Sequence, residues 1–77
     1  MDVKAAAAAC RESIDKCNAP EKNREFGKDH LHNMINKIES GEVSGDKAHR
    51  WLGYLQGVLV ATGGTTLEDM KQVNLAS

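Results

Sequence analysis

The amino-acid sequence predicts an all-α protein, a small antiparallel bundle or hairpin of three to four helices. In each long segment the apolar residues recur at intervals of three and four, which places them on one side of a helix. Proline and glycine residues separate these segments and indicate turns. With 77 residues, the chain is near the size below which a domain buries too little apolar surface to fold alone. We therefore expect a single helical domain spanning residues 1–77 that self-association completes.

The first predicted helix spans residues 2–17. Its apolar stripe consists mostly of small residues, Val3, Ala7, Cys10, Ile14 and Cys17, and suits close packing. Pro20 interrupts the segment because it has no backbone N–H to donate. The two cysteines lie about 10 Å apart along a helix that rises ~1.5 Å per residue, which is too far for a disulfide. We expect two reduced, buried thiols.

The second predicted helix spans residues 20–40, since Pro20 and Glu21 suit a first turn. Its inward face combines Leu31, Met34, Ile35 and Ile38, preceded by Phe26 and His30. Gly27 inside a helix costs about 1 kcal/mol relative to alanine and indicates a close backbone contact. Gly41 is the expected left-handed stop. The short stretch that follows turns the chain back antiparallel, with Ser44 as the expected N-cap.

The third predicted helix spans residues 46–62 and has two apolar stripes. One contains Ala48, Leu52, Leu55, Leu59 and Thr62, and the other contains Trp51, Tyr54, Val58 and Ala61. The helix therefore needs something besides the second helix to cover it. Gly63 and Gly64 end it. Thr65 with Glu68 three residues later matches a capping box for a short final helix, 66–73.

Gly53 and Gly57 form a Gly-x-x-x-Gly pair on the third predicted helix. Each glycine costs about 1 kcal/mol of helix propensity, so two of them one turn apart require an explanation. We expect them to let the first helix or a second copy of the chain approach closely; contact with a flat ligand is the alternative. The predicted interface of a homo-oligomer consists of Trp51, Gly53, Tyr54, Gly57 and Val58.

The formal net charge of −1 gives no overall field that would attract nucleic acid or an acidic membrane. No window of the sequence reaches the ~20 apolar residues of a membrane span, and the start of the chain lacks the pattern of a signal peptide. We therefore expect a cytoplasmic protein without a membrane partner.

Basic residues occupy the first turns of the third predicted helix, where the helix dipole disfavours cations by roughly 0.3–1 kcal/mol. A bound anion such as a phosphate would reverse that penalty. Trp51 could stack an aromatic base while Arg50 holds a phosphate. The predicted anion or nucleotide site consists of Lys28, His30, Lys47, His49, Arg50, Trp51 and Tyr54. The alternative is that the charges are solvated and that Trp51 is a packing residue.

No pattern of catalytic or metal-binding residues is present. His30 and His32 are two positions apart, so on a helix they point about 200° away from each other and cannot share an ion. The segment Gly63-Gly64-Thr65-Thr66 follows a helix and lacks the lysine of a phosphate-binding loop. We expect no metal, no cofactor and no enzymatic activity.

Residues 48–74 contain Arg-Trp-Leu-Gly-Tyr-Leu-Gln-Gly-Val-Leu-Val, then Gly-Gly, Thr-Leu-Glu-Asp-Met-Lys and a final Asn. In this segment the chain resembles a recurrent type of small, mostly uncharacterised bacteriophage-encoded helical protein. The alanine-rich start of the chain, up to Cys17, is not part of the resemblance. No functional residue is carried over from it.

The resemblance implies an accessory protein that acts on host machinery by binding. One hypothesis is a small oligomer that sequesters a nucleotide-type host defence signal between protomers. The second is an inhibitor or regulator that covers a host protein with the apolar side of the third helix. A DNA-binding helix-turn-helix is disfavoured by the near-neutral charge and by the apolar residues in the would-be recognition helix.

Overall fold

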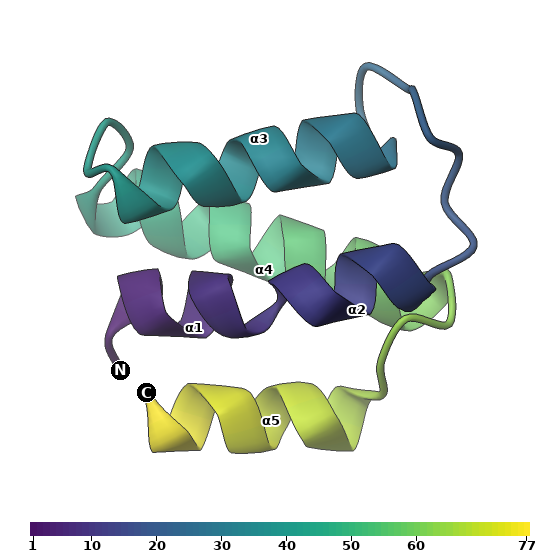
Figure 1. The fold of residues 1–77 in the computed structure, drawn as a ribbon. Coiled ribbons are helices and arrows are strands. Elements are labelled where there is room, and N and C mark those ends of the chain that lie inside the picture. Colours follow the sequence, from purple (N-terminus) through teal and green to yellow (C-terminus); the bar gives the residue numbers. More distant parts are fainter.

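The computed structural model describes residues 1–77 and contains helices and connections but no strand. Its helices are α1 (Val3–Ala9), α2 (Arg11–Lys16), α3 (Lys28–Glu39), α4 (Gly45–Ala61) and α5 (Leu67–Ala76). The prediction of an all-α chain is confirmed (Figure 1). None of the helices is long and apolar enough to cross a membrane.

The segments α1 and α2 form one arm that is interrupted at Cys10. The amide of Cys10 donates to the carbonyl of Ala7 at 3.0 Å, a tighter turn than that of an α-helix, while its thiol donates to the carbonyl of Ala6 at 3.3 Å. Helical bonding resumes where Ile14 donates to Cys10. The predicted single helix 2–17 is therefore a helical arm in two segments.

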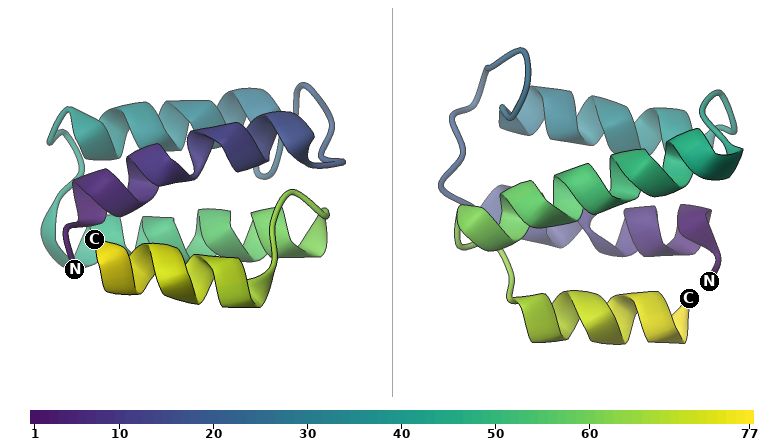
Figure 2. Two further views of the ribbon diagram at one scale, coloured as in Figure 1. Left: turned by 60° about the horizontal axis from the view of Figure 1, so that its bottom comes forward. Right: turned by 180° about the vertical axis from the view of Figure 1, so that it is seen from behind.

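The helices α3 and α4 run antiparallel, and the arm of α1 and α2 lies between α3 and α5 (Figures 1 and 2). The α1 segment contacts α3, α4 and α5. The two chain ends meet, because the amide of Asp2 donates to the carbonyl of Ser77 at 2.6 Å. The arm is therefore the central element of the fold, and α5 lies at its edge.

The hydrophobic core gathers apolar residues from every helix. Its members are Ala6, Ala7, Cys10, Ile14, Cys17, Ala19, Leu31, Met34, Ile35, Ile38, Val43, Ala48, Leu52, Leu55, Leu59 and Met70. The predicted inward residues of α3 at 31, 34, 35 and 38 are all buried, as are those of α4 at 48, 52, 55 and 59. Both cysteines are free and buried, as expected. The helical spacing of apolar residues therefore identified the buried faces correctly.

The predicted start of the second helix at residue 20 is wrong, because α3 begins at Lys28. The side chain of Asn23 accepts hydrogen bonds from the amides of Glu25 and Phe26, at 2.9 and 3.1 Å. A helix would need those amides for its own bonds, so the asparagine favours a turn. Phe26 is consequently 41% exposed and not part of an inward face. Gly27 is the N-cap of α3 rather than an interior residue.

The predicted helix ends are confirmed at two glycines and at the N-cap position of α4, and corrected at the cap of α5. Gly41 and Gly63 adopt positive φ angles of 83° and 79°, which glycine tolerates best. Ser44 is at the N-cap of α4 but its side chain makes no capping hydrogen bond. The cap of α5 is Thr66 rather than Thr65, and it accepts from the amide of Asp69 at 3.1 Å.

Gly53 and Gly57 do not pack against the first helix, so that prediction is wrong. Both are exposed, and a Cβ atom added to either would meet nothing within 4 Å. They lie away from the buried stripe of α4 and line a groove of about 370 Å³ beside α5. Packing of these glycines against a second copy remains a prediction.

Candidate anion-binding site

An open hollow of about 500 Å³ lies between α3, α4 and the connection that precedes α3. Its lining residues are Arg24, Glu25, His30, Met34, Arg50, Trp51 and Tyr54. Typical sites for small molecules have volumes of roughly 300–1,000 Å³, so the hollow has room for a ligand of nucleotide size.

Two helices supply most of the lining. On α4, Arg50 and Tyr54 are one turn apart and Trp51 is next to them, so all three project on the solvent side of the helix. On α3, His30 and Met34 are also one turn apart and meet them across the hollow. The hollow therefore combines cationic and aromatic side chains from α4 with the imidazole of His30 and the apolar side chain of Met34 from α3.

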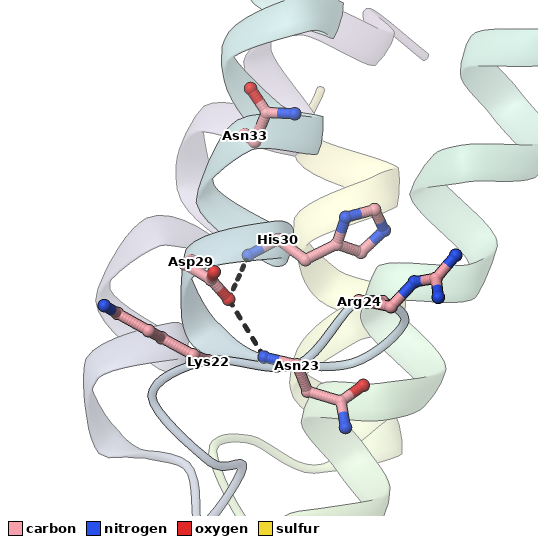
Figure 3. A pocket seen from close by; sticks show the side chains of 6 residues that line it. All are labelled: Lys22, Asn23, Arg24, Asp29, His30 and Asn33. Atoms are coloured by element: carbon pink, nitrogen blue, oxygen red, sulfur yellow. Dashed lines mark hydrogen bonds between the residues drawn. The ribbon is translucent and has the colours of Figure 1, made fainter.

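The connection before α3 folds back on the start of that helix. The amides of Lys28 and Asp29 donate to the carbonyls of Pro20 and Glu21 at 2.8 and 3.1 Å. The carboxylate of Asp29 accepts from the amides of Asn23 and His30 at 3.3 and 2.8 Å (Figure 3). These bonds hold the connection in a compact turn.

Gly27 is required for this turn. A Cβ atom at this position would overlap the backbone nitrogen of Asn23 and lie 2.8 Å from the carbonyl carbon of Lys22. The turn therefore brings Arg24 next to His30, with both side chains pointing to the same side, whereas Lys22 points away from them (Figure 3).

The two arginines of the hollow are the ones without a carboxylate partner. The chain has three arginines, and Arg11 pairs with Glu39 at 2.7 Å. Neither Arg24 nor Arg50 forms an ion pair. Glu25 is the single acidic residue in the lining. An unpaired guanidinium binds phosphate through two parallel hydrogen bonds, so this local charge favours an anion.

Trp51 is half-buried and forms an aromatic wall of the hollow. The ammonium of Lys47 lies 5.5 Å from the centroid of its ring, within the range of a cation–π contact. Lys47 itself does not line the hollow. It therefore adds positive charge beside the site without forming its wall.

Of the seven residues predicted for the site, the structure gathers His30, Arg50, Trp51 and Tyr54 around the hollow. Lys28 lies elsewhere, with its ammonium 3.7 Å from a carboxylate oxygen of Glu21 and 3.4 Å from the carbonyl of Asp15. The ring of His49 faces its own helix, with Nδ1 3.0 Å from the carbonyl of Gly45. Lys28 and His49 therefore do not belong to the hollow.

Three residues that line the hollow, Glu25, Met34 and Arg24, are absent from the predicted site. Arg24 supplies the second guanidinium of the lining. It lies on a turn, and helical spacing says nothing about where a turn residue points. The available signal was Asn23 followed by Gly27, since asparagine and glycine at such spacing are typical of turns.

A second, purely polar hollow of about 510 Å³ adjoins the first and shares Arg24 and His30 with it. Its other lining residues are Lys22, Asn23, Asp29 and Asn33 (Figure 3). His32 faces a different direction from His30 and lies 3.3 Å from a carboxylate oxygen of Asp15. The structure contains no cluster of three or more histidine, cysteine, aspartate or glutamate residues suited to a metal ion.

Comparison of the chain with protein families, with curated proteins and with solved structures found no match. Function is therefore inferred from the hollow itself.

Proposed function

We propose that this protein is a small, non-enzymatic binding protein that sequesters an anionic, nucleotide-type ligand. The proposed site is the hollow bounded by Arg24, His30, Arg50 and Trp51. One observation carries the proposal: both arginines that lack an ion pair line the same hollow as the sole tryptophan.

The chemistry of the lining suits a phosphate linked to an aromatic base. Hydrogen bonds from Arg24 and Arg50 to a phosphate are charge-assisted, and such bonds contribute about 1.5–3 kcal/mol each. A base stacked on Trp51 contributes roughly a further 1–3 kcal/mol. The carboxylate of Glu25 can accept a hydrogen bond from an amino group of the base. These contacts need no catalytic group, because sequestration requires only binding.

The resemblance of residues 48–74 suggests the setting. We propose a bacteriophage accessory protein that counters a host defence signal in the host cytoplasm, with the chain acting as a homo-oligomer. Marginal burial in so short a chain supports self-association, since oligomers commonly complete the core of small proteins.

The test is a thermal-shift panel of linear and cyclic nucleotides. A ligand at 100 times its Kd stabilises the folded state by about 2.7 kcal/mol, which raises the melting temperature measurably. We expect Arg50→Ala to abolish the shift. Lys71→Ala is the matched control, because Lys71 is exposed, forms no ion pair and lies on α5 away from the hollow. A wild-type protein that shows no shift with any nucleotide would contradict the proposal.

The alternative is a protein-binding inhibitor or regulator that acts through the apolar side of α4. The observation in its favour is that Tyr54 is 44% exposed near the half-buried Trp51 on α4. Large exposed aromatic residues are typical anchors of protein interfaces. In this case Trp51→Ala and Tyr54→Arg abolish capture of a host protein in a pull-down, while Arg50→Ala retains it. If both variants still capture the host protein, the apolar side of α4 is excluded as the binding surface.

A further inference from the structure

Tyr54 joins α4 to the turn that carries Arg24. Its hydroxyl donates a hydrogen bond to the backbone carbonyl of Glu25 at 2.5 Å. This is the only hydrogen bond between α4 and residues 20–27. Every other hydrogen bond of that segment is internal or goes to α3.

The turn is a compact unit in its own right. The amides of Glu25, Phe26 and Gly27 all donate to Asn23, the first two to its side chain and the third to its carbonyl at 3.3 Å. Little burial holds this unit in place, since residues 24–26 are exposed. A unit that is internally bonded but poorly buried moves as one body unless something fixes it. The Tyr54 hydroxyl is the contact that fixes it on the α4 side.

We infer that Tyr54 is a positioning residue, which holds the turn against α4 so that Arg24 and Arg50 face the same anion. In this role Tyr54 acts through Arg24 rather than by touching the ligand. We call the hydrogen bond from Tyr54 to Glu25 the tether. The tether itself does not depend on the proposed function, but its consequence for binding rests on that function. Without the hydroxyl, Arg24 is mobile in the free protein and has to be immobilised when the ligand binds. This loss of conformational freedom weakens binding.

The first test uses Tyr54→Phe, which removes only the hydroxyl, and measures amide hydrogen exchange by NMR. We expect the amides of Asn23, Lys28 and Asp29, whose hydrogen bonds join this segment to α3, to exchange about threefold to tenfold faster, the factor that corresponds to one net hydrogen bond. The amide of Asp69, which is bonded to Thr66 in α5, is the internal control. Arg24→Gln is the matched variant and leaves the three rates unchanged. Wild-type exchange rates in Tyr54→Phe would overturn the inference, and this test requires no ligand.

The second test is a double-mutant cycle with ATP as the probe, measured by calorimetry. We expect Tyr54→Phe to weaken ATP binding about threefold to tenfold in the wild type and to have no further effect in Arg24→Gln. Losses that multiply in the double variant mean that Tyr54 contacts the ligand itself, which overturns the positioning role. A wild type that binds no ATP counts against the proposed function, and the exchange rates alone then decide whether the tether exists.

Discussion

The side-chain amides of Gln56 and Asn74 hydrogen-bond to each other twice, with N–O distances of 2.8 and 3.2 Å. Gln56 is the one buried polar residue of the chain, with 8% of its surface exposed. The pair joins α4 to α5, whose contribution to the buried core is otherwise Met70 alone. A polar pair in a low-dielectric interior favours one arrangement of the two helices, because each amide needs the other.

We predict that Asn74→Ala lowers the free energy of unfolding by about 1–3 kcal/mol, since it removes both amide hydrogen bonds of the buried Gln56 and leaves its side chain only the long contact with the Cys10 sulfur at 3.9 Å. A double variant with leucine at both positions removes both polar groups and recovers much of that loss. Urea denaturation measures both effects. A double variant no more stable than Asn74→Ala would contradict this account of the pair.

We predict that Gly53→Ala and Gly57→Ala each raise the free energy of unfolding by up to about 1 kcal/mol, because alanine has the higher helix propensity. Neither added methyl group meets an atom within 4 Å. The same variants weaken self-association if these glycines contact a second copy, which sedimentation at several concentrations measures. Stabilised variants that associate as strongly as the wild type would remove both glycines from the predicted interface.

We predict the opposite effect for Gly27→Ala, whose methyl group would overlap the backbone of Asn23. The turn has to open, so we expect a loss of about 1 kcal/mol or more in unfolding free energy and weaker nucleotide binding through displacement of Arg24. The helical circular dichroism stays close to that of the wild type because the turn is exposed. Wild-type stability in this variant would show that the turn tolerates a side chain.

We predict that stability falls at alkaline pH partly through Cys10. Burial raises the pKa of the Cys10 thiol above its usual value of 9.0, and the hydrogen bond from Gln56 opposes this shift. The unfolded chain therefore loses this proton first as the pH rises. The contribution is fully present below pH 9.0 and declines as the pH rises above that value towards the folded-state pKa.

The pH prediction is checked by urea denaturation at about pH 8 and about pH 10, on either side of the usual thiol pKa. Cys10→Ala loses less stability over this interval than the wild type. Equal losses in both proteins would exclude Cys10 as a source of the pH dependence.

The buried faces of α3 and α4 could be predicted from sequence because burial imposes a spacing that local pattern reveals, as at Leu31, Ile35 and Leu55. The turn before α3 could not be predicted in the same way. It depends on the side chain of Asn23 and on carbonyls of Pro20 and Glu21 that accept bonds from the start of α3. Helical spacing contains no information about such a fold-back.

The candidate site likewise combines helical residues, which spacing predicts, with a turn residue, which it does not. Arg50, Trp51 and Tyr54 share one side of α4, so their spacing predicted that they act together. Arg24 joins them only because the turn brings it there. The exposed glycines of α4 were misinterpreted for a related reason, since spacing identifies small residues but not which neighbour lies opposite.

The fluorescence of Trp51, the sole tryptophan, tests the central proposal most directly. A titration with ATP and with cyclic nucleotides measures whether a base stacks on the ring. We predict a saturable change in emission that weakens with salt, because phosphate contacts are screened, and that both Arg24→Gln and Arg50→Gln strongly reduce. Emission that does not change with any nucleotide, or that changes equally in both arginine variants and the wild type, would contradict nucleotide binding at this hollow.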